Sequence, residues 1–266
     1  LVIGAHPFPE EVMEKCDHLQ IICKHGAGLD NIPLEKAKEC GIAVCNVPGT
    51  NSNAVADLAI GLMLAVTRNI VIANNRVRNG EWKPAIGVDV CFKTLGIFGF
   101  GAIAKNVARR ANGFGMKVLA YDPYVKEVPE EFKSFVTLSS IDEIIKNADI
   151  ISMHLPLTDE TRDMIAAKEM AAMKEGAYII NTARGGIVNE HDLYEAVKSG
   201  HIAGAALDVS EQEPMAEDNP LRTLENVIIT PHIGMYSKEA IGAVSLICAQ
   251  NAAAKLEGKE LQFRVV

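Results

Sequence analysis

The sequence predicts an α/β protein with a doubly wound parallel sheet and a second, smaller domain, and three observations predict it. Short apolar runs alternate with helical segments over most of the 266 residues, a pattern typical of parallel strands joined by helices. Most of these runs are apolar throughout, as expected where helices cover both faces of a sheet. A glycine-rich turn, Gly99–Ala104, joins one such strand to the helix that follows it.

The first part of the chain predicts the smaller domain. We interpret Gln20–Lys24 and Ile42–Val47 as strands, and Pro33–Cys40 as the helix between them. Asn53–Asn69 is a helical run rich in alanine and leucine, and it is too short and too polar at its ends to cross a bilayer, so we expect a buried helix. Because this set has few strands for a free-standing sheet and begins at Leu1, we expect the start of the domain to be missing from the sequence.

The stretch Asn74–Lys93 predicts a loop between the two sets of elements, because it contains Gly80, Pro84 and Gly87. A last helix, Ser237–Leu256, follows the final strand and is expected to return to the first domain. We therefore place one domain at residues 1–69 and 237–266, and the other at residues 70–236, with a junction near residue 70.

The larger domain is predicted from strands and helices that alternate after the glycine-rich turn. In its helices, apolar residues recur at helical spacing. The expected strands after the turn are Lys117–Tyr121, Asp149–Leu155, Ala177–Asn181, Ala203–Asp208 and Asn226–Thr230, and the expected helices include Ile141–Asn147, Ala167–Met173 and Glu190–Ser199.

The segment Thr94–Asp122 has the pattern of a dinucleotide site: strand, glycine-rich turn, amphipathic helix, strand and acid. Gly99 permits a tight turn, Gly101 lets the backbone approach a pyrophosphate, and Ala104 lets the helix lie close to the strand. The first amides of the helix favour negative charge. Asp122 follows Gly99 by 23 residues, where an acid accepts hydrogen bonds from an adenosine ribose. The sequence therefore predicts a bound dinucleotide.

Composition excludes several classes of function. The formal net charge of −8 argues against a broad attraction to nucleic acid, and no apolar run approaches the ~20 residues that cross a bilayer. The six cysteines show neither a C-x-x-C pair nor a zinc-ligand spacing, so we expect no metal site and interpret them as small, buried, reduced side chains. A cytoplasmic protein is expected by default.

Three polar residues follow three of the predicted strands: Arg184 in TARGGIV, Glu213 in SEQEP and His232 in TPHIG. Ligands gather at the carboxyl ends of strands in open parallel sheets. Reduction of a ketone by hydride needs a proton donor, which suits histidine, and a cation that orients the substrate, which suits the planar fork of arginine. Taken singly, Arg184 is equally compatible with a surface residue or helix cap, and Glu213 and His232 are more typical of a solvated loop acid and a structural histidine. Their joint occurrence in a sheet with a nucleotide turn favours catalysis.

Several segments resemble, in order and spacing, the NAD-dependent D-2-hydroxyacid dehydrogenases: GFGAIA with Asp122, NTARGGIV, GAALDVSEQEP and TPHIG. KHGAGLDNI and NVPGTNSNAVADLAIGLMLA are similar to the substrate domain of that family, in forms most like the short phosphoglycerate dehydrogenases. The resemblance implies a Rossmann NAD domain and a flavodoxin-like substrate domain, with the substrate in the cleft between them.

The resemblance also implies roles for the matched residues. Arg184 would bind the substrate carboxylate and polarise the keto oxygen, and His232 would be the general acid or base with Glu213 as its partner. The backbone amides of Ala27 and Gly28 would receive the carboxylate. Around the cofactor, the implied contacts are Gly99, Gly101, Ala102 and Ile103 at the pyrophosphate, Asp122 at the ribose, Leu155, Thr182 and Ala183 along the site, and Asp208 at the nicotinamide carboxamide.

The resemblance leaves the roles of two positions, Lys24 and His154, open. Lys24 stands where phosphoglycerate dehydrogenases usually have an arginine near the substrate phosphate, and a lysine there offers a point charge without the bidentate fork. His154 is either a cofactor contact or a packed histidine.

Asp122, followed by Pro123 and Tyr124, favours NAD over NADP, because its carboxylate would repel a 2′-phosphate and no arginine follows to receive one.

We therefore expect an NAD-dependent oxidoreductase that interconverts a small D-2-hydroxy acid and its 2-keto acid, with 3-phospho-D-glycerate, a precursor in serine biosynthesis, as the best single guess. Glyoxylate or hydroxypyruvate reduction and another D-2-hydroxyacid activity are alternatives, as is an NAD-sensing, corepressor-like binding protein. A homodimer is expected, as the family implies, with no nucleic acid or membrane partner. The stretch Arg76–Val90, which includes Trp82, is either an arm for that contact or an ordinary crossover.

Overall fold

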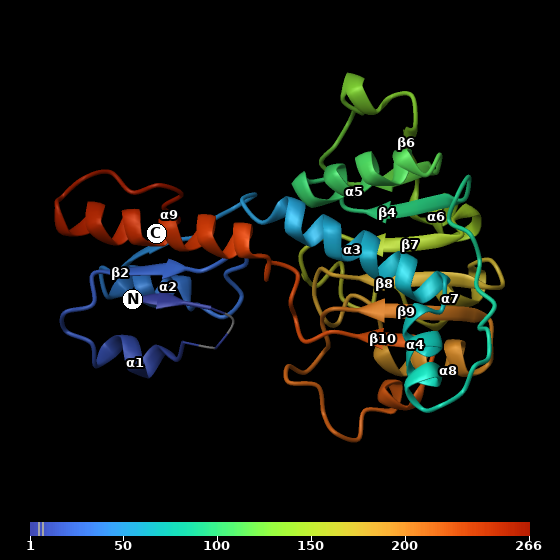
Figure 1. The fold of residues 1–266 in the computed structure, drawn as a ribbon. Coiled ribbons are helices and arrows are strands. Elements are labelled where there is room, and N and C mark those ends of the chain that lie inside the picture. Colours follow the sequence, from blue (N-terminus) through green and yellow to red (C-terminus); the bar gives the residue numbers. More distant parts are fainter. Residues whose placement is uncertain (5, 7) are drawn as a thin grey trace. The chain divides into compact units, whose positions relative to one another are not determined.

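A parallel sheet of seven strands forms the centre of the larger of two units in the computed structural model, which describes residues 1–4, 6 and 8–266 (Figure 1). The strand order is β10-β9-β8-β7-β4-β5-β6, and every neighbouring pair is parallel. The predicted doubly wound α/β architecture is therefore confirmed. The strands are β4 (Thr94–Phe98), β5 (Lys117–Tyr121), β6 (Val136–Leu138), β7 (Ile150–Met153), β8 (Ala177–Asn181), β9 (Ile202–Leu207) and β10 (Val227–Ile229).

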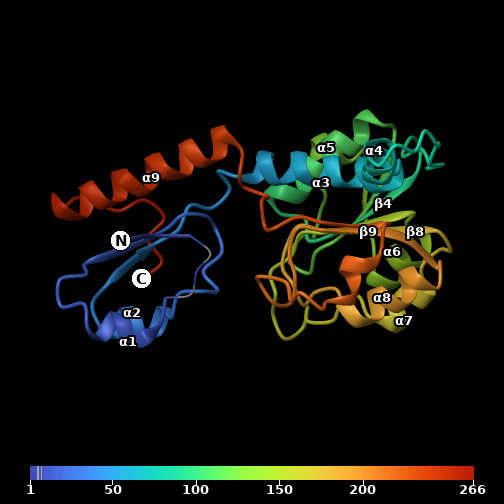
Figure 2. The same cartoon turned by 60° about the horizontal axis from the view of Figure 1, so that its bottom comes forward.

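Helices cover both faces of this sheet (Figure 2). On one face lie α3 (Ser52–Thr67), α4 (Ile70–Arg78) and α5 (Ala102–Gly113), and on the other α6 (Ile141–Asn147), α7 (Ala167–Ala172) and α8 (Glu190–Lys198). Two short 3₁₀ turns, η1 (Glu130–Phe132) and η2 (Pro220–Thr223), complete the unit. Each face has its own buried apolar cluster, which explains why the strands are apolar on both sides.

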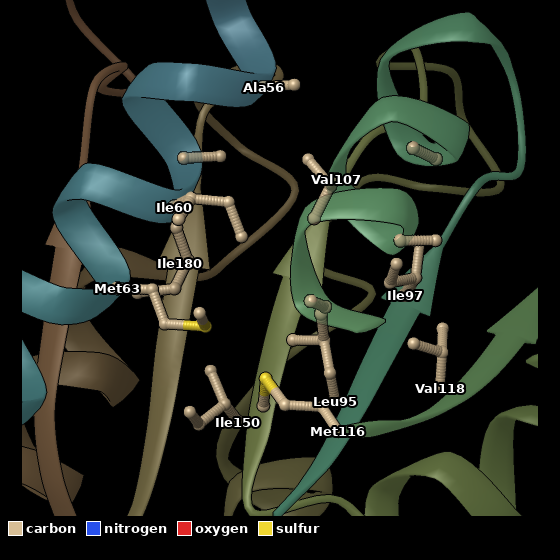
Figure 3. Packing of buried hydrophobic residues seen from close by; sticks show 14 of the residues in the cluster. Ala56, Ile60, Met63, Leu95, Ile97, Val107, Met116, Val118, Ile150 and Ile180 are labelled. Carbon is tan, nitrogen blue, oxygen red and sulfur yellow. The ribbon is translucent and has the colours of Figure 1, made fainter. Parts of the chain in front are cut away.

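The cluster beneath α3 and α5 shows how helical spacing builds the core (Figure 3). Ile60 and Met63 of α3 and Val107 of α5 point into it, and they meet Ile150 and Ile180 of the sheet. The buried residues of α5 recur at positions three and four apart, as in any helix with one apolar stripe. This packing fixes the first turn of α5 against the end of β4.

The smaller unit is a three-stranded parallel sheet in the order β1-β2-β3, formed by β1 (Val2–Ile3), β2 (Ile21–Lys24) and β3 (Ala43–Cys45). Its helices are α1 (Glu10–Glu14), α2 (Leu34–Glu39) and α9 (Lys238–Leu256). The C-terminal helix α9 packs on β2 and buries Val244 and Cys248 against the sheet.

The boundaries of the two units differ from the expected ones. The chain divides into Leu1–Ala54 with Met235–Val266, and Val55–Gly234, so the first boundary lies upstream of the expected junction near residue 70. The reason is the apolar face of α3, which is buried in the core of the larger unit and consists of Ala56, Ala59, Ile60, Leu62, Met63 and Val66. Amphipathic spacing reveals that a helix is buried, but not in which domain.

The loop expected from Asn74 to Lys93 was wrong at its start, because α4 continues to Arg78. No residue of α4 is buried, and Asn74, Asn75 and Asn79 have low helix propensity, so the sequence gives only a weak helix signal there. The short strands β1 and β6 and the helix α1 were not predicted either, since runs of two to five residues give too little periodicity.

Among the described residues, all six cysteines are free thiols, but only Cys23, Cys45 and Cys248 are buried. The interpretation as buried side chains was therefore wrong for Cys16, Cys40 and Cys91, which are exposed. No single helix in this part of the chain is long and apolar enough to span a membrane; α3 and α4 pass such a test only as a pair, and they are bent by 64° at the break between them.

Candidate active site

The strand order of the larger sheet reverses between β4 and β7, where open α/β sheets bind their ligands. At this point β4 ends and the turn Gly99–Gly101 leads into α5. Gly99 has φ of 86°, and a Cβ there would lie 2.6 Å from the carbonyl oxygen of His154, so only glycine fits. A Cβ at Gly101 would meet nothing within 4 Å, which leaves the first amides of α5 open to an anion.

Asp122 directly follows β5, and its side chain is hydrogen-bonded to the glycine-rich turn that follows β4. Its Oδ2 accepts a hydrogen bond from the backbone N–H of Phe100 at 2.8 Å, and its Oδ1 accepts one from Tyr124 at 2.9 Å. An ionised carboxylate offers about four acceptor positions, so each oxygen can accept a further hydroxyl. The acid therefore holds the glycine-rich turn in place and keeps acceptor capacity for a ribose.

Two buried polar atoms in the described part of the chain have no hydrogen-bond partner: Oγ1 of Thr182, which follows β8, and Nδ1 of His154, which follows β7. The other ring nitrogen of His154 lies 2.9 Å from Oγ of Ser152. Burial lowers the pKa of His154 to about 4, so its ring is neutral at physiological pH. A buried unpaired polar atom costs about 1–3 kcal/mol, and at a strand end it is typical of a ligand site. These orphan atoms and the open turn at Gly101 fit a dinucleotide.

The loop that carries Arg184 is held by the side chain of Asn181 at the end of β8. Its Oδ1 accepts the N–H of Ala183 at 3.0 Å, and its Nδ2 donates to the carbonyl oxygen of Arg184 at 2.8 Å. The guanidinium of Arg184 donates to the carbonyl oxygen of Ala183 at 2.7 Å. The next residue, Gly185, packs so closely on the backbone of Ser210 that a Cβ would overlap the Ser210 carbonyl group. This contact joins the loop of Arg184 to the loop that follows β9.

Glu213 and His232 form the central pair of the site. Oε2 of Glu213 lies 2.8 Å from Nδ1 of His232, and each side chain is 38% exposed. Burial opposes ionisation of Glu213, but the bond and charge of His232, the amide of Ser210 and the charge of Arg184 outweigh it and lower the pKa of Glu213. Glu213 and His232 are thus brought together, and Arg184 is near enough for its charge to act on Glu213.

The loop of His232 is anchored by Asp208, which directly follows β9 and is 1% exposed. Oδ1 of Asp208 accepts from the Thr230 hydroxyl at 2.6 Å and from the N–H of Ile233 at 2.8 Å, and Oδ2 accepts from the N–H of Gly234 at 2.8 Å. Burial raises the pKa of Asp208, against these hydrogen bonds. The anchored loop holds His232 at a φ of 54°, which few non-glycine residues adopt.

The remaining predicted residues differ in how exposed they are. Leu155 is buried beside the turn, while Ala102, Ile103 and Ala183 are accessible at least in part. In the smaller unit, Ala27 is exposed and Gly28 is partly exposed.

The side chain of Lys24 is buried within the smaller unit. Its Nζ donates to the carbonyl oxygen of Gly4 and to Oδ1 of Asn31, both at 2.6 Å. The predicted contact of Lys24 with a substrate phosphate draws no support from this geometry.

Sequence reasoning missed the residues that hold the loops. Asn181 in NTARGG is the last residue of β8, a position that could have identified it as a candidate. The anchoring role of Asp208 carries no such signal, because it depends on which backbone amides fold over the carboxylate.

The sequence and the fold of this chain are similar to those of known proteins. Residues 60–234 match the family model of the D-isomer specific 2-hydroxyacid dehydrogenase, NAD binding domain. The chain is 45% identical over 258 residues to a D-3-phosphoglycerate dehydrogenase of Methanocaldococcus jannaschii, covering 96% of this chain and 49% of that protein. It is also 45% identical over 246 residues to a hydroxypyruvate reductase of Thermotoga maritima, covering 90% and 78%.

A solved structure of a glyoxylate reductase from Paecilomyes thermophila superposes with a TM-score of 0.87 at 36% identity, covering 99% of this chain and 83% of the other. The chain thus spans about half the length of the phosphoglycerate dehydrogenase and about four fifths of the reductases that it matches.

Proposed function

The chain belongs to the D-isomer-specific 2-hydroxyacid dehydrogenases, with NAD as its cofactor, and we propose that it interconverts a small D-2-hydroxy acid and its 2-keto acid. The observation that carries the proposal is the 2.8 Å pair of His232 and Glu213, with Arg184 close enough to lower the pKa of Glu213. A proton donor, its carboxylate partner and a cation at one sheet edge are what reduction of a keto acid requires.

In this proposal each side chain has one task. NADH supplies the hydride that adds to the carbonyl carbon. Because Glu213 engages Nδ1 of His232, Nε2 is the nitrogen that gives its proton to the carbonyl oxygen, and Glu213 stabilises the imidazolium before that transfer. Arg184 pairs with the substrate carboxylate and polarises the keto oxygen. In oxidation His232 takes the proton back.

The cofactor contacts are proposed on the same footing. Gly99, Gly101, Ala102 and Ile103 form the turn and first helical amides that would receive the pyrophosphate, and Asp122 would accept from the ribose. The unpaired hydroxyl of Thr182 supports a contact there, with Leu155 and Ala183 beside it. Asp208, whose Oδ2 accepts from the N–H of Gly234, is proposed for the nicotinamide carboxamide.

We propose 3-phospho-D-glycerate as the substrate, supported by the similarity to a relative of that name and by the KHGAGLDNI and GTNSNAVAD segments. The amides of Ala27 and Gly28 would receive the carboxylate. Hydroxypyruvate or glyoxylate is the alternative, supported by the relatives named as reductases and by the internal bonds of Lys24.

A panel of 2-keto acids tests the function directly. We expect NADH oxidation, followed by absorbance, with the highest kcat/KM for 3-phosphohydroxypyruvate among that compound, hydroxypyruvate, glyoxylate and pyruvate. NADPH should be a poor donor, because Asp122 would repel a 2′-phosphate. A preference for hydroxypyruvate would replace the substrate and keep the enzyme class. Binding of NADH with no turnover of any keto acid would contradict the enzyme class and favour a sensor.

We also propose that the chain forms a homodimer through the arm Arg76–Val90. Trp82 and Ile86 are 89% and 93% exposed, and so large an apolar surface is typical of a contact with a second copy. Trp82→Ala combined with Ile86→Ala should convert the dimer to a monomer in sedimentation velocity. Tyr124→Ala is the control, since Tyr124 is an equally exposed aromatic residue outside the arm. A wild-type monomer, or a variant that remains dimeric, would contradict this contact.

A further inference from the structure

Glu190 is the first residue of α8, directly after the N-cap residue Asn189. A carboxylate in the first turn of a helix is stabilised by the unpaired amides and the helix dipole. In most helices such an acid faces solvent, but Glu190 is only partly exposed and its carboxylate is engaged outside its own helix.

Both oxygens of Glu190 hold the loop that follows β9. Oε1 accepts the backbone N–H of Glu211 at 2.7 Å, and Oε2 accepts a hydrogen bond from Nδ2 of Asn219 at 2.6 Å. The contact is reciprocal, since Oε1 of Glu211 accepts the backbone N–H of Glu190 at 3.1 Å. Two charge-assisted bonds therefore run from one side chain to two points of the loop.

Those two points lie on either side of Glu213. The stretch from Glu211 to Asp218 contains neither helix nor strand, and most of it is exposed, so it has few apolar contacts of its own to order it. Fixing the backbone of one residue costs roughly 1–2 kcal/mol of conformational entropy. The bonds to Glu190 supply part of the order that places the Glu213 carboxylate beside Nδ1 of His232.

We propose that Glu190 is a positioning residue for the acid–base pair: it holds the Glu211–Asn219 loop so that Glu213 reaches His232. Its effect on turnover rests on the proposed function, whereas its effect on the position of Glu213 does not. A glutamine at this position keeps an acceptor for the Glu211 amide but replaces the other acceptor with a donor, so a carboxylate is the group that serves both bonds.

The test compares Glu190→Ala and Glu190→Gln with Glu195→Ala, a control that removes an exposed acid from the same helix. The first readout is the pKa of the Glu213 carboxyl, followed by ¹³C NMR and assigned with Glu213→Gln. Loss of the negative charge of Glu190 alone would lower that pKa. Displacement of Glu213 from His232 and Ser210 would raise it, so the sign separates a positional effect from a through-space effect.

We expect Glu190→Ala to raise the pKa of Glu213 and to lower kcat for keto acid reduction by roughly 10- to 100-fold, with the Kd for NADH unchanged. Glu190→Gln should lose less, because one bond survives, and Glu195→Ala should change neither quantity.

An unchanged or lowered Glu213 pKa in Glu190→Ala would overturn the proposal, even if kcat and the melting temperature fell. A raised Glu213 pKa together with a lowered kcat in Glu195→Ala would overturn it as well. If the wild-type protein turned over no keto acid, the proposed function would fail and the titration of Glu213 would still decide the role of Glu190.

Discussion

Replacing His232 by glutamine is expected to lower kcat for keto acid reduction by about 10²–10⁴-fold, the usual contribution of a positioned general acid. Glutamine can keep a hydrogen bond to Glu213, but it cannot give up a proton to a developing alkoxide. The affinity for NADH should stay close to that of the wild-type protein, because the glycine-rich turn and Asp122 are untouched.

Steady-state kinetics and NADH fluorescence titration measure the two quantities. His191→Gln is the matched control, since it changes an exposed histidine on α8 and should leave kcat unchanged. Turnover of His232→Gln near the wild-type rate would rule out His232 as the proton donor. A large loss of NADH binding in that variant would mean that the histidine supports the cofactor site instead.

Among glycine-to-alanine substitutions in the larger unit, Gly185→Ala is expected to lower stability the most. The added carbon would overlap the carbonyl group of Ser210, and backbone atoms cannot move aside as a flexible side chain can. Overpacking of this kind costs at least about 1–3 kcal/mol. The displaced loops carry Arg184 and Glu213, so kcat should also fall by about 10²-fold, since a shift of about 1 Å has that effect.

Thermal unfolding followed by circular dichroism, with steady-state kinetics on the folded protein, measures both losses. A melting temperature lower by ~3–10 °C is expected from the energy above. Gly113→Ala is the control, because a Cβ there meets no atom within 4 Å. A Gly185→Ala protein with the stability and kcat of the wild type would show that the two loops are not locked together.

Strong periodicity made much of the fold predictable. β5, β8 and α6 begin and end at the predicted residues, because continuous apolar runs and the Ser140 and Glu143 capping box mark their limits. The second half of α4 was not predicted, since none of its residues is buried and the asparagines there have low helix propensity. The boundary at Ala54 was equally hidden, because it lies inside one continuous helix.

The site was predictable as far as topology reaches. Arg184, Glu213 and His232 follow strands of one parallel sheet, whose carboxyl ends share an edge, so their convergence could be inferred without coordinates. The contacts that hold these three residues in place could not be predicted in the same way. The Gly185 contact and the bonds of Glu190 arise where separate loops touch, and no spacing within a single segment encodes them.

The single tryptophan of the chain, Trp82, stands almost wholly in water on the proposed arm. In a folded monomer its emission should therefore have the long wavelength of an indole in solvent, and melting of the hydrophobic core would change the spectrum little. In the proposed dimer, a second copy would cover the indole and shift the emission to the blue. Intrinsic fluorescence would therefore report dissociation of the proposed dimer, and it would report unfolding of the monomer only weakly.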